Sequence, residues 1–185
     1  MDTSVVLPVL QGSIDLTKPE APLGLHEQRA AQVIANLQHN RVRSFVTPTV
    51  VAEYLHAAIR GRYQHEIATT STSEMVARFG TRTRSWTQLY KHDPTILRGM
   101  EPQFRNLRSV LRANGIGFID PIDYPPPPNW RGFIPELLDL SLRYSLDTND
   151  ARILLEAQSL GIPHIVTLDR DMQRAAPDFT VYSWL

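Results

Sequence analysis

Four acidic residues in this chain of 185 residues have the types and the local context that metal-dependent chemistry requires. Asp169 directly follows the apolar run HIVTL, and Asp150 opens the helical pattern DARILLEA that precedes it. Glu53 lies in the first turns of the pattern TPTVVAEYLHAA, and Asp2 opens MDTSVVLPVL. Because ligands of open parallel sheets bind beyond the carboxyl ends of the strands, we expect these four acids to meet at one sheet edge.

Clustered carboxylates repel one another and are costly to bury unless a cation lies among them. Mg²⁺ and Mn²⁺ prefer oxygen ligands, and Mg²⁺ also takes phosphate oxygens from its substrate. Such a site polarises a phosphodiester and lowers the pKa of a bound water. The four acids therefore predict a Mg²⁺- or Mn²⁺-dependent phosphodiester hydrolase. The acids also suit structural roles, since Asp147 or Thr148 can cap a helix with Asp150 in its first turn, and Asp169 can cap the segment DMQRAA.

The elements that must position these acids alternate between strands and helices. Apolar, β-branched or aromatic runs between turn residues predict strands at 42–46, 116–122, 164–168 and 180–184. Helical spacing of apolar residues predicts helices over 30–37, after Pro48, over 76–90, 104–111, 133–144 and 151–158. This alternation indicates an α/β fold with a parallel sheet.

The middle of the chain departs from this alternation. Residues 61–115 are the least sheet-like part and predict a helical hairpin, and the prolines at 125–128 predict a stiff connection. The length fits one domain, 1–185, with a helical and proline-rich insert at about 61–130.

The composition excludes several classes of protein. With no cysteine, the chain has no disulfide scaffold, thiolate zinc site or cysteine nucleophile. No apolar run approaches the length of a membrane span, and no basic region followed by an apolar stretch opens the sequence. We therefore expect a cytoplasmic protein without a membrane partner.

A net charge of zero conceals a basic middle region. Residues 41–112 hold eleven arginines and one lysine against five acids. Some of these arginines have helical spacing, which would align them on a helix face: Arg78 with Arg82, and Arg105 with Arg108 and Arg112. Because arginine suits bidentate phosphate contacts, these five residues are candidates for binding an RNA backbone. The alternative is ordinary surface charge paired with nearby acids such as Glu101.

The motifs that carry the acids resemble those of the PIN-domain nucleases. That family has an Asp-Thr-Ser or Asp-Thr-Asn start, and here stands DTSVVLPVL; it has a helix-start glutamate, and here stands TPTVVAEYLH. Its most specific block is an Asp-Ala pair opening a helix, a glycine stop and a strand ending in Thr-x-Asp, matched here by NDARILLEAQSLGIPHIVTLDRDM. The similarity covers 149–172, 2–10 and 44–57 and is absent over 61–130, a longer central insert than in the compact VapC-like toxins.

This resemblance implies a three-layer α/β/α fold with a central parallel sheet in the strand order 3-2-1-4-5. It implies a metal-dependent endoribonuclease in which Asp2, Glu53, Asp150 and Asp169 are the catalytic metal ligands, with Asp147 and Asp171 as spare ligands. Thr3 or Ser4 and Thr167 would be the hydroxyls that support these ligands. Because the family's first strand precedes its first aspartate, that strand either forms mainly from residues after Asp2 or begins upstream.

The resemblance leaves several alternatives open. Many bacterial members are toxins of toxin–antitoxin pairs, which implies an antitoxin and a homodimer as candidate partners besides RNA. A PIN-like binding or scaffold protein that has lost catalysis is one alternative function. A DNA nuclease is another, because carboxylates and Mg²⁺ do not distinguish ribose from deoxyribose.

Overall fold

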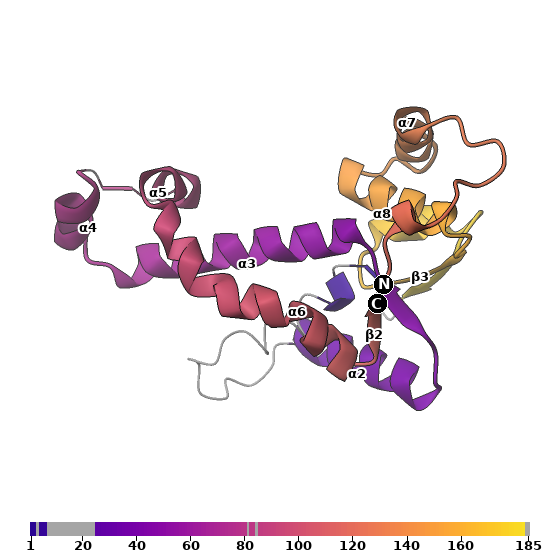
Figure 1. The fold of residues 1–185 in the computed structure, drawn as a ribbon, viewed down its shortest axis with the longest axis horizontal. Helices are drawn as coiled ribbons and strands as arrows, with labels where there is room; N and C mark the ends of the chain where they lie inside the picture. Colours follow the sequence, from indigo (N-terminus) through magenta and orange to yellow (C-terminus); the bar gives the residue numbers. More distant parts are fainter. Residues whose placement is uncertain (3, 7–24, 81, 84, 184–185) are drawn as a thin grey trace. The chain divides into compact units, whose positions relative to one another are not determined.

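The computed structural model describes residues 1–2, 4–6, 25–80, 82–83 and 85–183 (Figure 1). Helices account for 66% of these residues. The chain divides into two compact units. Unit 1 combines Met1–Ala52 with Arg108–Leu185, and unit 2 is Glu53–Leu107.

Unit 1 contains the strands and the helices that flank them. Its elements are α2 (Leu25–His39), β1 (Ser44–Val46), β2 (Ile116–Phe118), η2 (Pro121–Asp123), α7 (Phe133–Tyr144), α8 (Thr148–Ser159), β3 (His164–Thr167), η3 (Asp171–Ala175) and β4 (Thr180–Ser183). Residues 4–6 are also helical. The predicted helix over 133–144 is confirmed with both bounds, and four predicted strands are present in shorter form.

The predicted three-layer α/β/α fold with a central parallel sheet is wrong. Among the described residues, the strands form two separate parallel pairs, β1 with β2 and β3 with β4. Ser44 pairs with Ile116 in the first, and His164 pairs with Thr180 in the second. No sheet of more than two strands is present in the part of the chain that the structure describes, so the strand order 3-2-1-4-5 is not formed.

The physical reason lies at the start of the chain, where a first strand had to join the two pairs. Residues 4–6 turn into a helix instead, and the Val5 N–H donates to the Asp2 carbonyl at 3.2 Å. The Met1 nitrogen donates to the Phe45 carbonyl at 2.7 Å, and the Asp2 N–H donates to the Val166 carbonyl at 2.9 Å. Met1 is thus linked to β1 and Asp2 to β3, but one hydrogen bond to each strand does not form a β-ladder.

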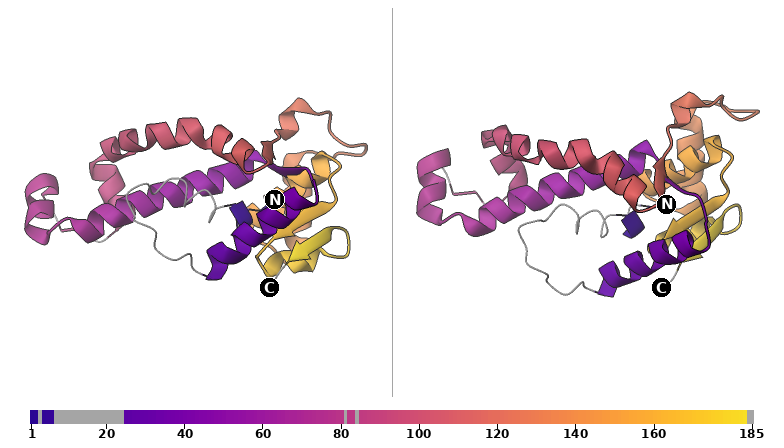
Figure 2. Two further views of the ribbon diagram at one scale, coloured as in Figure 1. Left: turned by 90° about the horizontal axis from the view of Figure 1, so that it is seen from below. Right: turned by 60° about the horizontal axis from the view of Figure 1, so that its bottom comes forward.

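Helix α8 forms the centre of the apolar core in unit 1. Ala151, Leu154 and Leu155 are almost fully buried, and Figure 2 shows α8 beside α7 and close to the β3–β4 pair. Asp147 caps the start of α8, and the chain leaves its end through Gly161, whose φ of 66° is a left-handed conformation that favours glycine. The two signals set the start and the end of α8.

Unit 2 is helical. It takes in most of α3 (Pro48–Thr69), all of α4 (Thr72–Phe79), α5 (Trp86–His92) and η1 (Pro94–Met100), and the first half of α6 (Glu101–Ala113). Its core includes Tyr63, whose ring meets that of Tyr90 edge-on at 5.7 Å and whose hydroxyl donates to the Asp93 carbonyl at 2.8 Å.

The helix predicted over 76–90 is wrong, because the structure divides it into α4 and α5. Gly80 ends α4 in a left-handed conformation with φ of 71°. Thr83 is buried between the two helices, and its hydroxyl donates to the Gln88 side chain at 2.7 Å. A glycine in this conformation ends a helix, so Arg82 does not share a helix face with Arg78.

The strand predicted over 116–122 is also shorter than expected. β2 ends at Phe118, and Asp120 caps a short 3₁₀ turn by accepting from the Ile122 N–H at 3.1 Å. Pro121 has no N–H to donate, so it cannot continue a strand ladder. None of the described helices combines the length and the apolar character needed to cross a membrane.

Candidate metal-binding and catalytic site

Asp2 is a buried carboxylate held by two hydroxyl groups. Its side chain lies in unit 1 with 3% of its surface exposed. Ser4 Oγ donates to Asp2 Oδ2 at 2.6 Å, and Thr167 Oγ1 donates to the same oxygen at 2.7 Å. Because Thr167 is the last residue of β3, these bonds fix the Asp2 carboxylate at the carboxyl end of that strand.

The two hydroxyls also accept from the backbone. The Leu168 N–H donates to Ser4 Oγ at 2.8 Å, and the Asp169 N–H donates to Thr167 Oγ1 at 2.8 Å. Each hydroxyl has a single proton, and each directs it to Asp2, so two short chains of hydrogen bonds run from the backbone to the carboxylate. Hydrogen bonds in such chains polarise one another, which strengthens the hold on Asp2.

Asp169 is half-buried at the same strand end. Its Oδ1 accepts from the Asp171 N–H at 2.8 Å, which is the capping role that the segment DMQRAA allows. Asp171 is exposed, and its carboxylate pairs with Arg174 at 2.8 Å. The arginine satisfies Asp171 on the surface, so Asp169 is the better candidate of the two for a metal ligand.

Asp150 and Asp147 occupy the start of α8. Asp147 is the N-cap, and its Oδ1 accepts from the Asn149 N–H at 2.8 Å and the Asp150 N–H at 3.0 Å. Asp150 is half-buried in the first helical turn, where the positive end of the helix dipole favours a carboxylate. Asp147 therefore acts as the cap that fixes the first turn and with it the backbone of Asp150.

The remaining predicted residues fall elsewhere. Glu53 is half-buried in α3 and is the first residue of unit 2, whereas Asp2, Asp150 and Asp169 belong to unit 1. Thr3 lies outside the described residues. Within 1–2, 4–6, 25–80, 82–83 and 85–183, no three His, Asp or Glu side chains gather closely enough to hold a metal ion. The meeting of the four acids at one point stays a prediction.

The chemistry of the donors at Asp2 fits a hard divalent cation. Mg²⁺ binds carboxylates and commonly keeps several waters, completing its shell with phosphate oxygens of the substrate. Carboxylates that ligate metals are themselves held by hydrogen bonds from neighbouring groups. Ser4 and Thr167 give Asp2 that kind of support.

A second buried carboxylate was not predicted from the sequence. Glu156 lies on the buried face of α8, accepts from the Thr49 hydroxyl at 2.6 Å and from the Thr49 N–H at 3.3 Å, and lies 3.6 Å from Arg152. The sequence signal for this contact was an acid inside the apolar run LLEA. An acid in such a run is expected to be buried, and a buried charge needs a partner. This contact ties α8 to the first turn of α3, within unit 1.

The five arginines proposed to bind RNA have different surroundings. Arg78 lies 3.2 Å from Glu66 and 4.9 Å from the centre of the Phe79 ring. Arg105 Nε donates to Glu101 at 2.8 Å, as the surface-charge alternative expects. Arg82, Arg108 and Arg112 are exposed, and they have no ion pair with another described residue. Two of the five are thus already neutralised by acids of unit 2.

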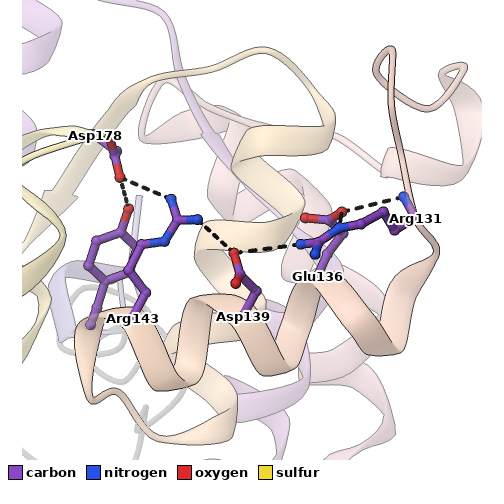
Figure 3. A network of polar contacts seen from close by, with 6 residues as sticks. Arg131, Glu136, Asp139, Arg143 and Asp178 are labelled. Atoms are coloured by element: carbon purple, nitrogen blue, oxygen red, sulfur yellow. Dashed lines mark hydrogen bonds and ion pairs between the residues drawn. The ribbon is translucent and has the colours of Figure 1, made fainter.

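A network of charges on α7 gives a contrasting example, in which arginines and acids alternate (Figure 3). Arg143 lies 2.8 Å from Asp139 and 3.4 Å from Asp178, and Arg131 lies 2.8 Å from Glu136. The Arg131 guanidinium lowers the pKa of the Glu136 carboxyl, chiefly by a hydrogen bond. The Tyr144 hydroxyl donates a hydrogen bond to Asp178, and this bond is the largest cause of the lowered pKa of that carboxyl. All five charged residues of this network are paired with one another.

Comparison with known proteins found no matching family model, no matching curated protein and no matching solved structure. The resemblance to the PIN-domain nucleases therefore rests on the sequence motifs alone.

Proposed function

We propose that this protein is a divalent-metal-dependent ribonuclease whose central residue is Asp2. The observation that carries the proposal is the buried Asp2 carboxylate, held by Ser4 and Thr167 at the carboxyl end of β3. Asp169 follows the same strand, and Asp150 and Glu53 are the other acids proposed to take part. These donors meet at Asp2 although the described strands form no central sheet.

The role of each residue follows from its contacts. Asp2 would bind Mg²⁺ or Mn²⁺ directly, while Ser4 and Thr167 fix the orientation of its carboxylate. Asp169 would bind the same ion or one of its waters, with its backbone held to Thr167. The metal, when bound, would activate a water and offset charge on the leaving oxygen. No protein nucleophile is required.

RNA is the proposed substrate because of the basic region at 41–112. Arginine binds phosphate through two parallel hydrogen bonds, and the affinity should fall steeply with salt. An antitoxin protein, a homodimer and a cytoplasmic location are further parts of the same proposal, and they rest on the family resemblance and the composition only.

The test is cleavage of RNA by the full chain with Mn²⁺ and with a chelator. We expect Mn²⁺-dependent cleavage that Asp2→Asn abolishes while the helical circular dichroism signal is retained. Asp123→Asn is the matched control: Asp123 is also in unit 1, is exposed, and has no side-chain partner among the described residues.

Three outcomes decide between the functions under consideration. RNA binding without cleavage in any divalent metal would favour a binding protein and contradict the proposal. Cleavage of DNA but not RNA by the same acids would show a DNA nuclease. Equal activity in Asp2→Asn and Asp123→Asn would remove Asp2 from the site.

A further inference from the structure

A pocket of about 270 Å³ lies in unit 1, where α2 ends and where β1 and β2 begin. Ile34, Leu37 and Ile116 give it an apolar lining, and Arg41 and Arg43 are the charged residues of the lining. We call it the Arg41 pocket. It adjoins the amino ends of β1 and β2 and is also lined by Met1, whereas the Asp2 carboxylate is held by Thr167 at the carboxyl end of β3 and is not part of the lining.

The arginines of this pocket have no internal partner. Neither Arg41 nor Arg43 forms an ion pair or a side-chain hydrogen bond within the part of the chain that the structure describes. The segments 28–52 and 108–119, which supply most of the lining, contain five arginines and no acid. Arg143 provides the comparison, because it lines a second pocket of about 410 Å³ but is paired there with Asp139 and Asp178.

The backbone at Arg41 gives an independent reason to look for a function. The Val42 N–H donates to the Leu37 carbonyl at 2.9 Å, and the Arg41 N–H donates to the Gln38 carbonyl at 3.0 Å. This pattern closes α2 with Arg41 in a left-handed conformation, φ 54°. Glycine is the residue that this position favours, and a side chain here carries a conformational cost. The backbone conformation therefore does not favour an arginine over a glycine at this position.

Helix electrostatics offers a structural explanation that makes a different prediction. Helices α2 and α6 both end beside this pocket, and a cation near a helix C-terminus is stabilising. On that explanation, removal of the Arg41 guanidinium lowers stability. If Arg41 serves a ligand, Arg41→Gly relieves the left-handed backbone and removes binding without loss of stability.

We propose that the Arg41 pocket binds one nucleotide of a single-stranded RNA. The base would lie against Ile34, Leu37 and Ile116, and the phosphate would lie between Arg41 and Arg43. The volume suits a single base, and an apolar lining with a few polar groups is the usual character of a small-ligand site. The choice of RNA over a free nucleotide rests on the proposed function, and the proposal adds a substrate-holding site separate from the acids.

The test measures binding of a short single-stranded RNA to the full chain in a chelator, so that cleavage plays no part. Arg41→Gly and Arg43→Gln should each weaken binding about tenfold or more, the loss expected for a charged hydrogen bond. The salt dependence should become shallower by about 0.7 in log–log slope for each phosphate contact removed. Arg170→Gln is the control, because Arg170 is exposed and lies outside the pocket.

Competition and stability complete the test. Adenosine 5′-monophosphate should displace the RNA, inorganic phosphate should displace it much less well, and Arg41→Gly should unfold at or above the wild-type temperature. Unchanged RNA affinity in Arg41→Gly, with or without a lowered unfolding temperature, would overturn the proposal. Equal competition by inorganic phosphate and by adenosine 5′-monophosphate would also overturn it. Because binding is measured in a chelator, failure of the proposed catalysis would leave this result distinct.

Discussion

The two ends of the strands in unit 1 carry opposite chemistry. At the carboxyl end of β3, the Asp2 carboxylate is buried under two hydroxyls, with Asp169 next to it. At the amino ends of β1 and β2, Arg41 and Arg43 line a pocket, and the segments 28–52 and 108–119 that supply most of its lining contain no acid. The difference suggests a division of labour, with cation binding at one end and phosphate binding at the other.

The largest expected effect is at the carboxyl end. Asp2→Asn removes the charge that would bind the metal, and we expect RNA cleavage to fall by more than about 100-fold, beyond the loss caused by supporting residues. Single-turnover cleavage in Mn²⁺ measures this effect. RNA affinity in a chelator should be unchanged, and a parallel loss of affinity would break the comparison between the two ends.

Removal of one supporting hydroxyl should have a smaller effect on cleavage. Thr167→Val keeps the shape of the side chain but deprives Asp2 of one donor and the Asp169 N–H of its acceptor. We expect a 10–100-fold fall in Mn²⁺ affinity or activity, while Thr167→Ser should retain most of both. Calorimetric titration with Mn²⁺ gives the measurement, and equal behaviour of the two variants would contradict the role of the hydroxyl.

The buried carboxylate of Glu156, which is bonded to Thr49, should affect stability and not function. Thr49→Val removes the hydroxyl that donates to Glu156 and should destabilise the protein by about 1–3 kcal/mol. Urea unfolding measures this change. Mn²⁺ affinity and RNA affinity should stay at wild-type values; a selective loss of either in a protein of normal stability would give Glu156 a functional role.

The smallest expected effect concerns pH and the paired charges of α7. Because the pKa of Glu136 is lowered in the folded state, its pairing with Arg131 stabilises the protein above the ordinary value of 4.5. That contribution to stability is lost as the pH falls through the lowered pKa that Glu136 has in the folded state. Glu136→Gln should therefore reduce stability at pH 7 and have little effect at the acid end, as measured by urea unfolding at several pH values. A uniform loss at every pH would contradict the charge argument.

Local signals in the sequence predicted the elements well but not how the strands associate. The helix at 133–144 and the strands near 44, 116, 164 and 180 follow from periodicity and turn residues. Among the described residues, the expected first strand is not formed at 4–6, because these residues bond back to Asp2 as a helix, and the apolar run alone does not reveal this. Periodicity also continued across Gly80, where a left-handed backbone ends α4.

The candidate site was predictable in part. The acids at strand and helix ends indicated where carboxylates stand, and the contacts of Thr167 with Asp2 and Ser4 join residues 163 or more positions apart. Pairing over such a distance depends on the fold and has no local signature. The sequence contains even less indication of the Arg41 pocket. Its unusual feature is the left-handed backbone of Arg41, and arginine is an ordinary residue on a protein surface.

The central claim is that Asp2 binds a divalent cation at the carboxyl end of β3. The most direct measurement is the broadening of backbone amide resonances by Mn²⁺, which acts only near the bound ion. We predict selective broadening of Thr167, Leu168 and Asp169 in the wild-type chain, and its loss in Asp2→Asn but not in Asp123→Asn. Undisturbed resonances at these residues in the wild-type chain, or the same broadening in Asp2→Asn, would contradict the account.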